Sequence, residues 1–260
     1  MDVKPNDQIE RCVDCQGTVA ESMVKWDCLP VRTFGGLPSS RLKAVTVGLN
    51  PALDDWLDEN KKPWRTPTER AAIVQDYHKE KRQDLTDEDC ADAVRRRGEY
   101  FWSPDKKWHR YFESMEVFLA RIDRRWSYVL GTVAHVDLIA CPTEMQFKKI
   151  PDAPRKDLLK NCESHFFQTL KDLPENTALL LNGDLPTSTI QRLGRIEARK
   201  PRELINVNGL SGFSGLVQLG NKNFVFCGWN RSAASLSMPI KLDLAFWVRD
   251  QVKNQGGRFE

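Results

Sequence analysis

Short, continuous apolar runs recur along this chain and predict buried β-strands. The first is Ala44-Val45-Thr46-Val47-Gly48, where β-branched residues are typical of a strand in a parallel sheet. Three more strands are expected at Thr132–Cys141, Ala178–Leu181 and Phe224–Cys227. Each of the four runs ends in polar or loop-forming residues, which predicts a strand followed by a loop.

Between these runs, apolar residues at three- and four-residue spacing predict helices. The strongest stripe runs from Trp108 to Ile122. Other helices are expected from a Thr68 cap to Arg82, from a Thr86 cap to Arg97, and over Lys156–Leu173, Pro186–Leu193 and Ile240–Val252. The alternation predicts a doubly wound α/β/α sandwich with a central, mostly parallel four-stranded sheet.

The charge pattern divides the chain further. Residues 1–40 are polar and irregular, so we expect an N-terminal arm followed by one α/β domain over 41–260. A highly charged helical insertion is expected at about 66–107. Basic residues cluster at Arg95-Arg96-Arg97, at Lys106-Lys107 and from Arg192 to Arg202. Such clusters suit phosphate contacts, although a solvated surface has the same composition.

Composition narrows the class of protein. The chain of 260 residues is 40% hydrophobic and 29% charged, which is typical of a globular protein. It has no apolar run of membrane-spanning length and starts with polar residues, so we expect a cytoplasmic protein with no membrane partner. A net charge of +3 is mild, and any nucleic-acid binding must therefore use a local patch.

Cysteine usage leaves two interpretations open. Seven cysteines, an odd number, argue against a disulfide framework. Cys12 and Cys15 have metal-ligand spacing, and Cys28 offers a third thiolate, with Cys90 a weaker candidate. A closed zinc site needs four ligands and no fourth is evident. We therefore expect no cofactor and free or buried thiols, with a metal site at Cys12, Cys15 and Cys28 as the alternative.

Unusual polar residues accompany three of the predicted strands. Asn50 follows the first, Asp137 lies within the second and Asn230 follows the last. Because the carboxyl ends of parallel strands meet at one sheet edge, the three side chains are expected to share a crevice. The chain has no Gly-x-Ser-x-Gly, P-loop or His-Glu-x-x-His motif, and its four histidines match no metal-binding spacing.

Four short segments together resemble the uracil-DNA glycosylase superfamily. Gly48-Leu49-Asn50-Pro51-Ala52 is similar to the Gly-Ile-Asn-Pro-Gly motif of its mismatch-specific and thymine-DNA branch. Asn230-Arg231-Ser232-Ala233-Ala234-Ser235 resembles the second motif, Asn-Pro-Ser-Gly-Leu-Ser. Pro63-Trp64 resembles the family's Pro-Phe, and Asp137-Leu138-Ile139-Ala140-Cys141 resembles the strand that carries a base-reading Asn.

The resemblance implies a monofunctional DNA glycosylase that flips a nucleotide out of DNA and hydrolyses the bond between base and sugar. Asn50 would orient the attacking water, and Asn230 would stabilise charge on the base O2. The base-binding residues would be Asp137, Trp64, Ala52 and Leu49, with Trp64 stacking on the base. DNA contacts would come from Arg231, Ser232, Ser235, Lys106 and Lys107. We expect a monomer that binds DNA and needs no small-molecule cofactor.

Departures from the family pattern bear on the substrate. Ala234 stands where the family inserts a leucine into the duplex, so Leu236, Met238 or another part of the chain would fill that role. Ala52 replaces a tyrosine that excludes substituents at the pyrimidine C5. An ionised Asp137 only accepts hydrogen bonds, which suits the amino group of cytosine better than the O4 of uracil.

These departures favour a C5-modified cytosine as the substrate, such as the modified cytosines of phage DNA. Such a substrate predicts a role in antiviral defence. The conventional alternative is repair of uracil or thymine mispaired with guanine. Two further alternatives belong to other classes of protein. One is a catalytically inactive nucleic-acid-binding protein with the same fold, and the other is an α/β hydrolase-like enzyme acting on a small nucleoside.

Overall fold

The computed structural model describes residues 9–26, 29–31, 33–36, 40–50, 85–102, 109–197, 204–207 and 209–257. The expected helix from Thr68 to Arg82 lies outside these residues, as do Cys28, Ala52, Trp64 and the Lys106-Lys107 pair. The chain divides into two compact units. The first unit comprises Met1–Arg32, Asn50–Arg97 and Asp137–Phe166, and the second comprises Thr33–Leu49, Gly98–Val136 and Phe167–Glu260.

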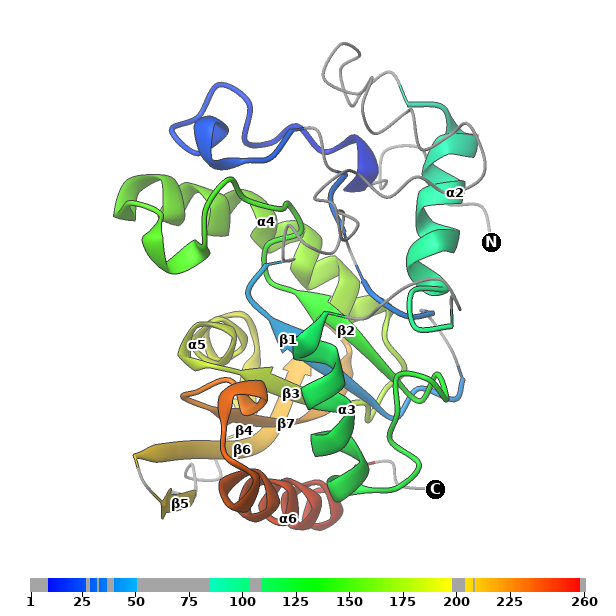
Figure 1. Ribbon diagram of the computed structural model, residues 1–260, viewed down its shortest axis with the longest axis vertical. Coiled ribbons are helices and arrows are strands. Elements are labelled where there is room, and N and C mark those ends of the chain that lie inside the picture. Colours follow the sequence, from blue (N-terminus) through cyan, green and yellow to red (C-terminus); the bar gives the residue numbers. More distant parts are fainter. Residues whose placement is uncertain are drawn as a thin grey trace. The chain divides into compact units, whose positions relative to one another are not determined.

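A seven-stranded sheet forms the centre of the second unit (Figure 1). Its strands are β1 Ala44–Gly48, β2 Val133–Asp137, β3 Ala178–Asn182, β4 Arg195–Glu197, β5 Leu204–Val207, β6 Leu210–Leu219 and β7 Lys222–Trp229. The strand order is β2-β1-β3-β7-β6-β4, with β5 also paired to β6. All four predicted strands are present and the α/β class is confirmed. The prediction of only four strands was wrong.

The additional strands form an antiparallel extension. β1 pairs with β3 and β3 with β7 in parallel, whereas β6 pairs antiparallel with β7, β4 and β5. The β6–β7 hairpin turns at Gly220 and Asn221, and Gly220 has a φ of +65°, which glycine adopts without strain. β4 lies inside the basic segment 192–202, for which the sequence pattern predicted no strand.

Helices cover both faces of this sheet. Phe118 of α3 (Arg110–Ile122) contacts Trp229 of β7, with ring centroids 5.6 Å apart. The neighbouring residue Gly228 instead lies against Thr187 of α5 (Asp184–Leu193). Because successive strand residues point to opposite faces, α3 and α5 lie on opposite sides of β7. The predicted α/β/α layering is therefore present in the second unit (Figure 1).

The apolar stripe of α3 is core, as predicted. Phe112, Met115, Phe118, Leu119 and Ile122 are all buried. His109 caps the helix, because its side chain accepts a hydrogen bond from the Tyr111 N–H at 3.3 Å. α6 (Met238–Asn254) packs beside α3 and closes this face of the sheet. The stripe therefore serves packing of the core.

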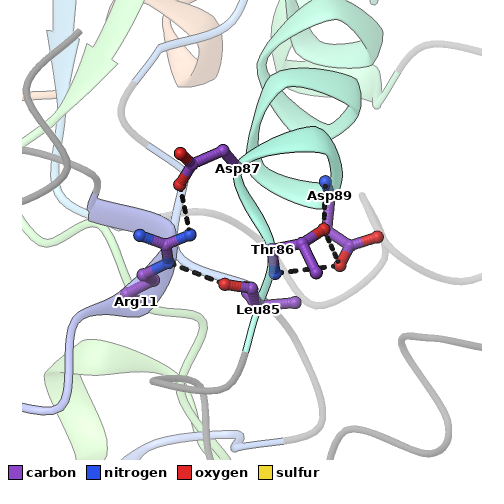
Figure 2. Close-up of polar contacts among 5 residues, drawn as sticks. All are labelled: Arg11, Leu85, Thr86, Asp87 and Asp89. Atoms are coloured by element: carbon purple, nitrogen blue, oxygen red, sulfur yellow. Dashed lines mark hydrogen bonds and ion pairs between the residues drawn. The ribbon is translucent and has the colours of Figure 1, made fainter.

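The described part of the first unit contains short irregular segments, α2 (Asp87–Gly98) and most of α4 (Asp152–Asp172). Thr86 caps α2 as predicted (Figure 2). Its hydroxyl accepts from the Asp89 N–H at 3.2 Å, and the Asp89 carboxylate accepts from the Thr86 N–H at 3.0 Å. This reciprocal capping pairs two backbone donors that the start of the helix leaves without partners.

The N-terminal arm is tied to α2 by two arginines. Arg11 donates to the Leu85 carbonyl at 2.9 Å and to the Asp87 carboxylate at 2.6 Å (Figure 2). Arg97 donates to Glu10 at 2.7 Å, and both side chains of this second pair are largely buried. The arm is thus fixed by charge-assisted hydrogen bonds at both ends of α2. Within the described part of the chain, no helix is long and apolar enough to cross a membrane.

Candidate functional site

Asn50 lies two residues after β1, at the point where the strand gives way to a loop. Its side chain is half-buried, and its amide nitrogen donates a hydrogen bond to Thr143 Oγ1 at 3.1 Å. Thr143 is itself buried and donates its hydroxyl hydrogen to the Met145 carbonyl at 2.7 Å. The amide is therefore held in a defined orientation at a sheet edge where ligands commonly bind.

Asp137 is the last residue of β2, at the exit of that strand rather than within it as predicted from the sequence. Its side chain is buried, with 6% of its surface exposed. A buried carboxylate at a strand exit is costly unless it interacts with other polar groups. Asn50 and Asp137 both belong to the first unit. Leu49, the remaining described base-binding candidate, is half-buried beside Asn50 in the sequence and belongs to the second unit.

Asn230 follows β7 directly, but its side chain pairs with a neighbouring hairpin. The amide oxygen accepts from the Ser211 N–H at 3.1 Å, and the amide nitrogen donates to the Gly209 carbonyl at 3.0 Å. Its backbone N–H also donates to the Ser211 carbonyl at 3.0 Å. In this arrangement the amide extends the sheet hydrogen bonding. The bond to Gly209 uses one of the two hydrogens on the amide nitrogen, and donation to a base O2, as the resemblance implies, would use the other.

Asn182, which the sequence analysis did not select as a site residue, holds the second motif in place. It is buried at the end of β3, and its amide oxygen accepts from Trp229 Nε1 and from the Ala233 N–H, both at 3.1 Å. Its amide nitrogen donates to the Tyr111 hydroxyl at 2.7 Å. The polar strand end Asn182-Gly183-Asp184 was a signal for this role, but its partners are set by the fold.

A second contact fixes another peptide group of the same loop. Ser114 of α3 donates to the Ala234 carbonyl at 2.9 Å, and Lys241 of α6 donates to Ser114 Oγ at 2.5 Å. Burial lowers the pKa of the Lys241 ammonium below its ordinary value. The loop over 230–236 is thus held by buried side chains from β3 and α6 and by the half-buried Ser114 of α3.

The predicted DNA contacts on this loop face solvent to different degrees. Arg231 and Ser235 are exposed and Ser232 is half-exposed. Of the two proposed replacements for the family leucine, Leu236 is only 6% exposed, whereas Met238 is 46% exposed at the start of α6. Of these two residues, Met238 is thus the one whose side chain is exposed outside the core.

The described arginines of the two basic clusters differ in the exposure of their side chains. Arg95 and Arg192 have exposed side chains. Arg97 instead forms the largely buried pair with Glu10, so its role is structural.

Four cysteines of the first unit interact electrostatically: Cys12 and Cys15 of the arm, Cys141 after β2 and Cys162 on α4. Burial raises the pKa of the Cys162 thiol well above its ordinary value, and the charges of Cys141, Cys15 and Cys12 raise it further. Asn161, next to Cys162, donates to Cys15 Sγ at 3.6 Å. Three of these thiols are buried and Cys12 is half-buried.

Two further metal-ligating side chains lie beside this group. Cys12, Asp14 and His165 bring ligand atoms within 4.8 Å of one another. His165 Nε2 and Asp14 Oδ2 are 2.9 Å apart. Cys12 of the predicted metal site thus lies in a group of three ligand-type side chains, and Cys15 is not part of that group. Cys28 is outside the described residues, and Cys90 packs with Leu85 and Leu29 instead.

The described site residues thus form two groups, one in each unit. Asn50, Asp137 and the four thiols belong to the first, and the 230–236 loop with its supports belongs to the second. No protein-family model and no curated protein sequence matches this chain. Its function is therefore inferred from its own residues.

Proposed function

We propose that this protein is a monofunctional DNA glycosylase that excises a modified pyrimidine. The observation that carries the proposal is the oriented amide of Asn50 at the exit of β1. It stands in the sequence Gly48-Leu49-Asn50-Pro51, which resembles the first motif of the uracil-DNA glycosylase superfamily. The α/β/α layering of the second unit is compatible with this class.

In the proposed reaction, a water oxygen bonds to the sugar C1′ while the bond from C1′ to the base breaks. The electron pair of that bond leaves with the base, and the proton released by the water reaches the base through solvent. The transition state carries positive charge on the sugar and negative charge on the base. An asparagine is no strong base, so Asn50 contributes by positioning the water and stabilising charge.

The second motif is proposed to bind DNA. Its loop is fixed from inside by Asn182 and Ser114, and it presents Arg231 and Ser235 to solvent. A rigid loop loses little conformational entropy when it binds. Met238 follows it with an exposed apolar side chain of a kind that is inserted between base steps in other DNA-binding proteins.

The proposed substrate is a C5-modified cytosine, and Asp137 is the residue that favours it. A buried carboxylate accepts hydrogen bonds from the cytosine amino group and opposes the carbonyl O4 of uracil. A polar mismatch in a closed pocket costs orders of magnitude in discrimination. Such a substrate would make the protein an antiviral glycosylase, whereas preference for uracil or mispaired thymine would make it a repair enzyme.

The test is strand cleavage by alkali after incubation with duplexes that carry one modified base each. The panel contains uracil, thymine opposite guanine, 5-hydroxymethylcytosine and its glucosylated form, for the wild type and for Asp137→Asn. We expect excision of a modified cytosine by the wild type and a shift towards uracil in the variant. Efficient excision of uracil alone would indicate repair. DNA binding without any excision would indicate an inactive binder, and release of bases from free nucleosides only would indicate a nucleoside hydrolase.

A second proposal concerns Cys12, Asp14 and His165, for which the alternative to metal binding is a free cysteine beside a hydrogen-bonded Asp–His pair. Their ligand atoms lie within 4.8 Å of one another, and they offer three of the four ligands that a zinc ion takes. A bound cation would tie the arm to α4, which carries His165, and it has no step in the proposed reaction.

A further inference from the structure

The hydrogen bonds of Thr143 determine which way the Asn50 amide faces. A threonine hydroxyl carries one hydrogen. Thr143 gives that hydrogen to the Met145 carbonyl at 2.7 Å, so towards Asn50 it acts as an acceptor. The amide nitrogen of Asn50 supplies the matching donor at 3.1 Å. The nitrogen end of the amide therefore faces Thr143, and the oxygen end points away from it.

We infer that Thr143 is a positioning residue, which orients the Asn50 amide oxygen towards the attacking water. The inference rests on the proposed function, because it concerns the same reaction. A water about to attack must donate a hydrogen bond to an acceptor, and the amide oxygen is the acceptor that Asn50 offers. If the amide turned over, it would present a donor instead. Thr143 excludes that orientation because it has no second hydrogen to give.

The backbone around Thr143 is held on both sides by the N-terminal arm. Thr143 forms an antiparallel bridge with Val24. Lys25 N–H donates to the Pro142 carbonyl at 2.9 Å, and Glu144 N–H donates to the Met23 carbonyl at 3.0 Å. An ion pair between Lys25 and Glu144 at 3.3 Å flanks the bridge. A hydroxyl on so constrained a segment has little freedom to follow a rotating amide.

The first test is Thr143→Val, which keeps the branched shape and removes the hydroxyl. Single-turnover excision should fall on the order of tenfold or more, because misorientation of a catalytic group is costly. Affinity for an uncleavable 2′-fluorinated duplex with the same base should change less than about twofold, since the step affected is chemistry. Thr143→Ser, which keeps the hydroxyl, should recover most of the lost rate.

A matched control separates this role from simple loss of stability. Thr177 is a buried threonine that donates to the Pro174 carbonyl at 2.7 Å, in the second unit. Thr177→Val therefore removes the same kind of bond with no amide attached. It should lower the melting temperature as Thr143→Val does, while the excision rate stays within about twofold of wild type. A tenfold loss of rate in Thr177→Val as well would overturn the inference.

The sharpest readout is a double-mutant cycle with Asn50→Ala. If Thr143 acts through Asn50, Thr143→Val should have no further effect on the residual rate of Asn50→Ala. An undiminished tenfold loss in that background would show an independent role and overturn the inference. A spectroscopic measurement supports the cycle. The side-chain amide nitrogen resonance of Asn50, identified by its absence in Asn50→Ala, should shift in Thr143→Val and return in Thr143→Ser.

The failures of the two proposals have different signatures. If the wild type excises no base of the panel, the proposed function is wrong and the inference about Thr143 falls with it. If the wild type excises a base and Thr143→Val matches its rate, only the inference is wrong. An unshifted Asn50 amide resonance in Thr143→Val would likewise overturn the inference alone, since the hydrogen bond would then be absent in solution.

Discussion

Single amide groups carry most of the chemistry assigned to this chain, and each is held by neighbours that decide what it does. Asn50 donates to the Thr143 hydroxyl, Asn182 bridges a strand to a loop, and Asn230 is paired at both ends with backbone. The sequence alone identifies two of these strand-end positions, Asn50 and Asn230, by residue type. It does not distinguish a reactive amide from a structural one, because that depends on partners that are distant in the chain.

The first residue-scale prediction concerns Asn50. Asn50→Ala should lower single-turnover excision by a factor on the order of a hundred or more, because the water loses its positioning group. Binding of an uncleavable duplex should persist, which a filter or anisotropy assay will show. Near-normal excision by this variant would remove Asn50 from the mechanism.

The second concerns Met238, the exposed apolar residue after the second motif. Met238→Ala should slow excision from duplex DNA on the order of tenfold, equivalent to ~1.4 kcal/mol, because the space left by the flipped base is no longer filled. Excision from a single strand should be unaffected, since there is no stack to repair. Phe246→Ala is the control, because Phe246 is 47% exposed on the same helix. Equal losses on both kinds of DNA would contradict the wedge role.

At the scale of secondary structure, the predictions from sequence succeed where the periodicity is strong. The β1 run, the α3 stripe and the Thr86 cap are all found as predicted. β6 was missed although its Gly220-Asn221 turn is a typical hairpin signal. The two glycines within β6 interrupt the alternation of apolar and polar residues that predicts a strand. A Cβ at Gly212 would lie 2.8 Å from the Gly228 carbonyl, so glycine is required there by close packing that no local pattern reveals.

Packing of α5 on the sheet leads to a prediction about Gly228. A Cβ at this position would lie 2.6 Å from Thr187 Oγ1, so Gly228→Ala should lower the free energy of unfolding by about 1–3 kcal/mol. Urea denaturation measures the loss. Adding Thr187→Ala, which removes the two nearest atoms, should make the double variant more stable than the sum of the single effects. Strict additivity would show that the two residues do not clash.

The end of α3 leads to a prediction with a pH dependence. Arg125 donates side-chain and backbone hydrogen bonds to Asp123, and its side-chain hydrogen bond lowers the pKa of this carboxyl below its ordinary value of 3.8. A lowered folded-state pKa stabilises the protein above pH 3.8, and this contribution is lost as the pH falls through the folded value. Asp123→Asn should therefore lower the melting temperature at pH 7 and make no difference well below pH 3.8. An equal loss at both pH values would contradict the ion pair.

For the whole molecule, the group of Cys12, Asp14 and His165 shows what sequence spacing cannot reveal. Cys12 and Asp14 are close in the sequence, but His165 comes from α4, much later in the chain. Only the fold brings the three together. The contact between Thr143 and Asn50 is likewise set by the fold, and no sequence pattern around Thr143 predicts it.

The metal proposal leads to a whole-molecule prediction. Purified protein should contain bound zinc, which elemental analysis detects. Replacing Cys12 by serine or His165 by alanine should remove the metal and lower the melting temperature, because the site ties the arm to α4. Cys90→Ser, the control outside the group, should keep the metal content. Metal-free wild-type protein with an unchanged melting temperature after chelation would contradict the proposal.

The long-range pairing of the N-terminal residues has a consequence for biosynthesis. Val24 pairs with Thr143 and Phe34 with His135, partners that leave the ribosome more than a hundred residues later. At common rates of translation this delay is roughly 5–20 s. During that time, the segments that later bury the arm with Cys12 and Cys15 have not yet been synthesised. Protein made under oxidising conditions is therefore expected to lose these two thiols to oxidation before folding can protect them.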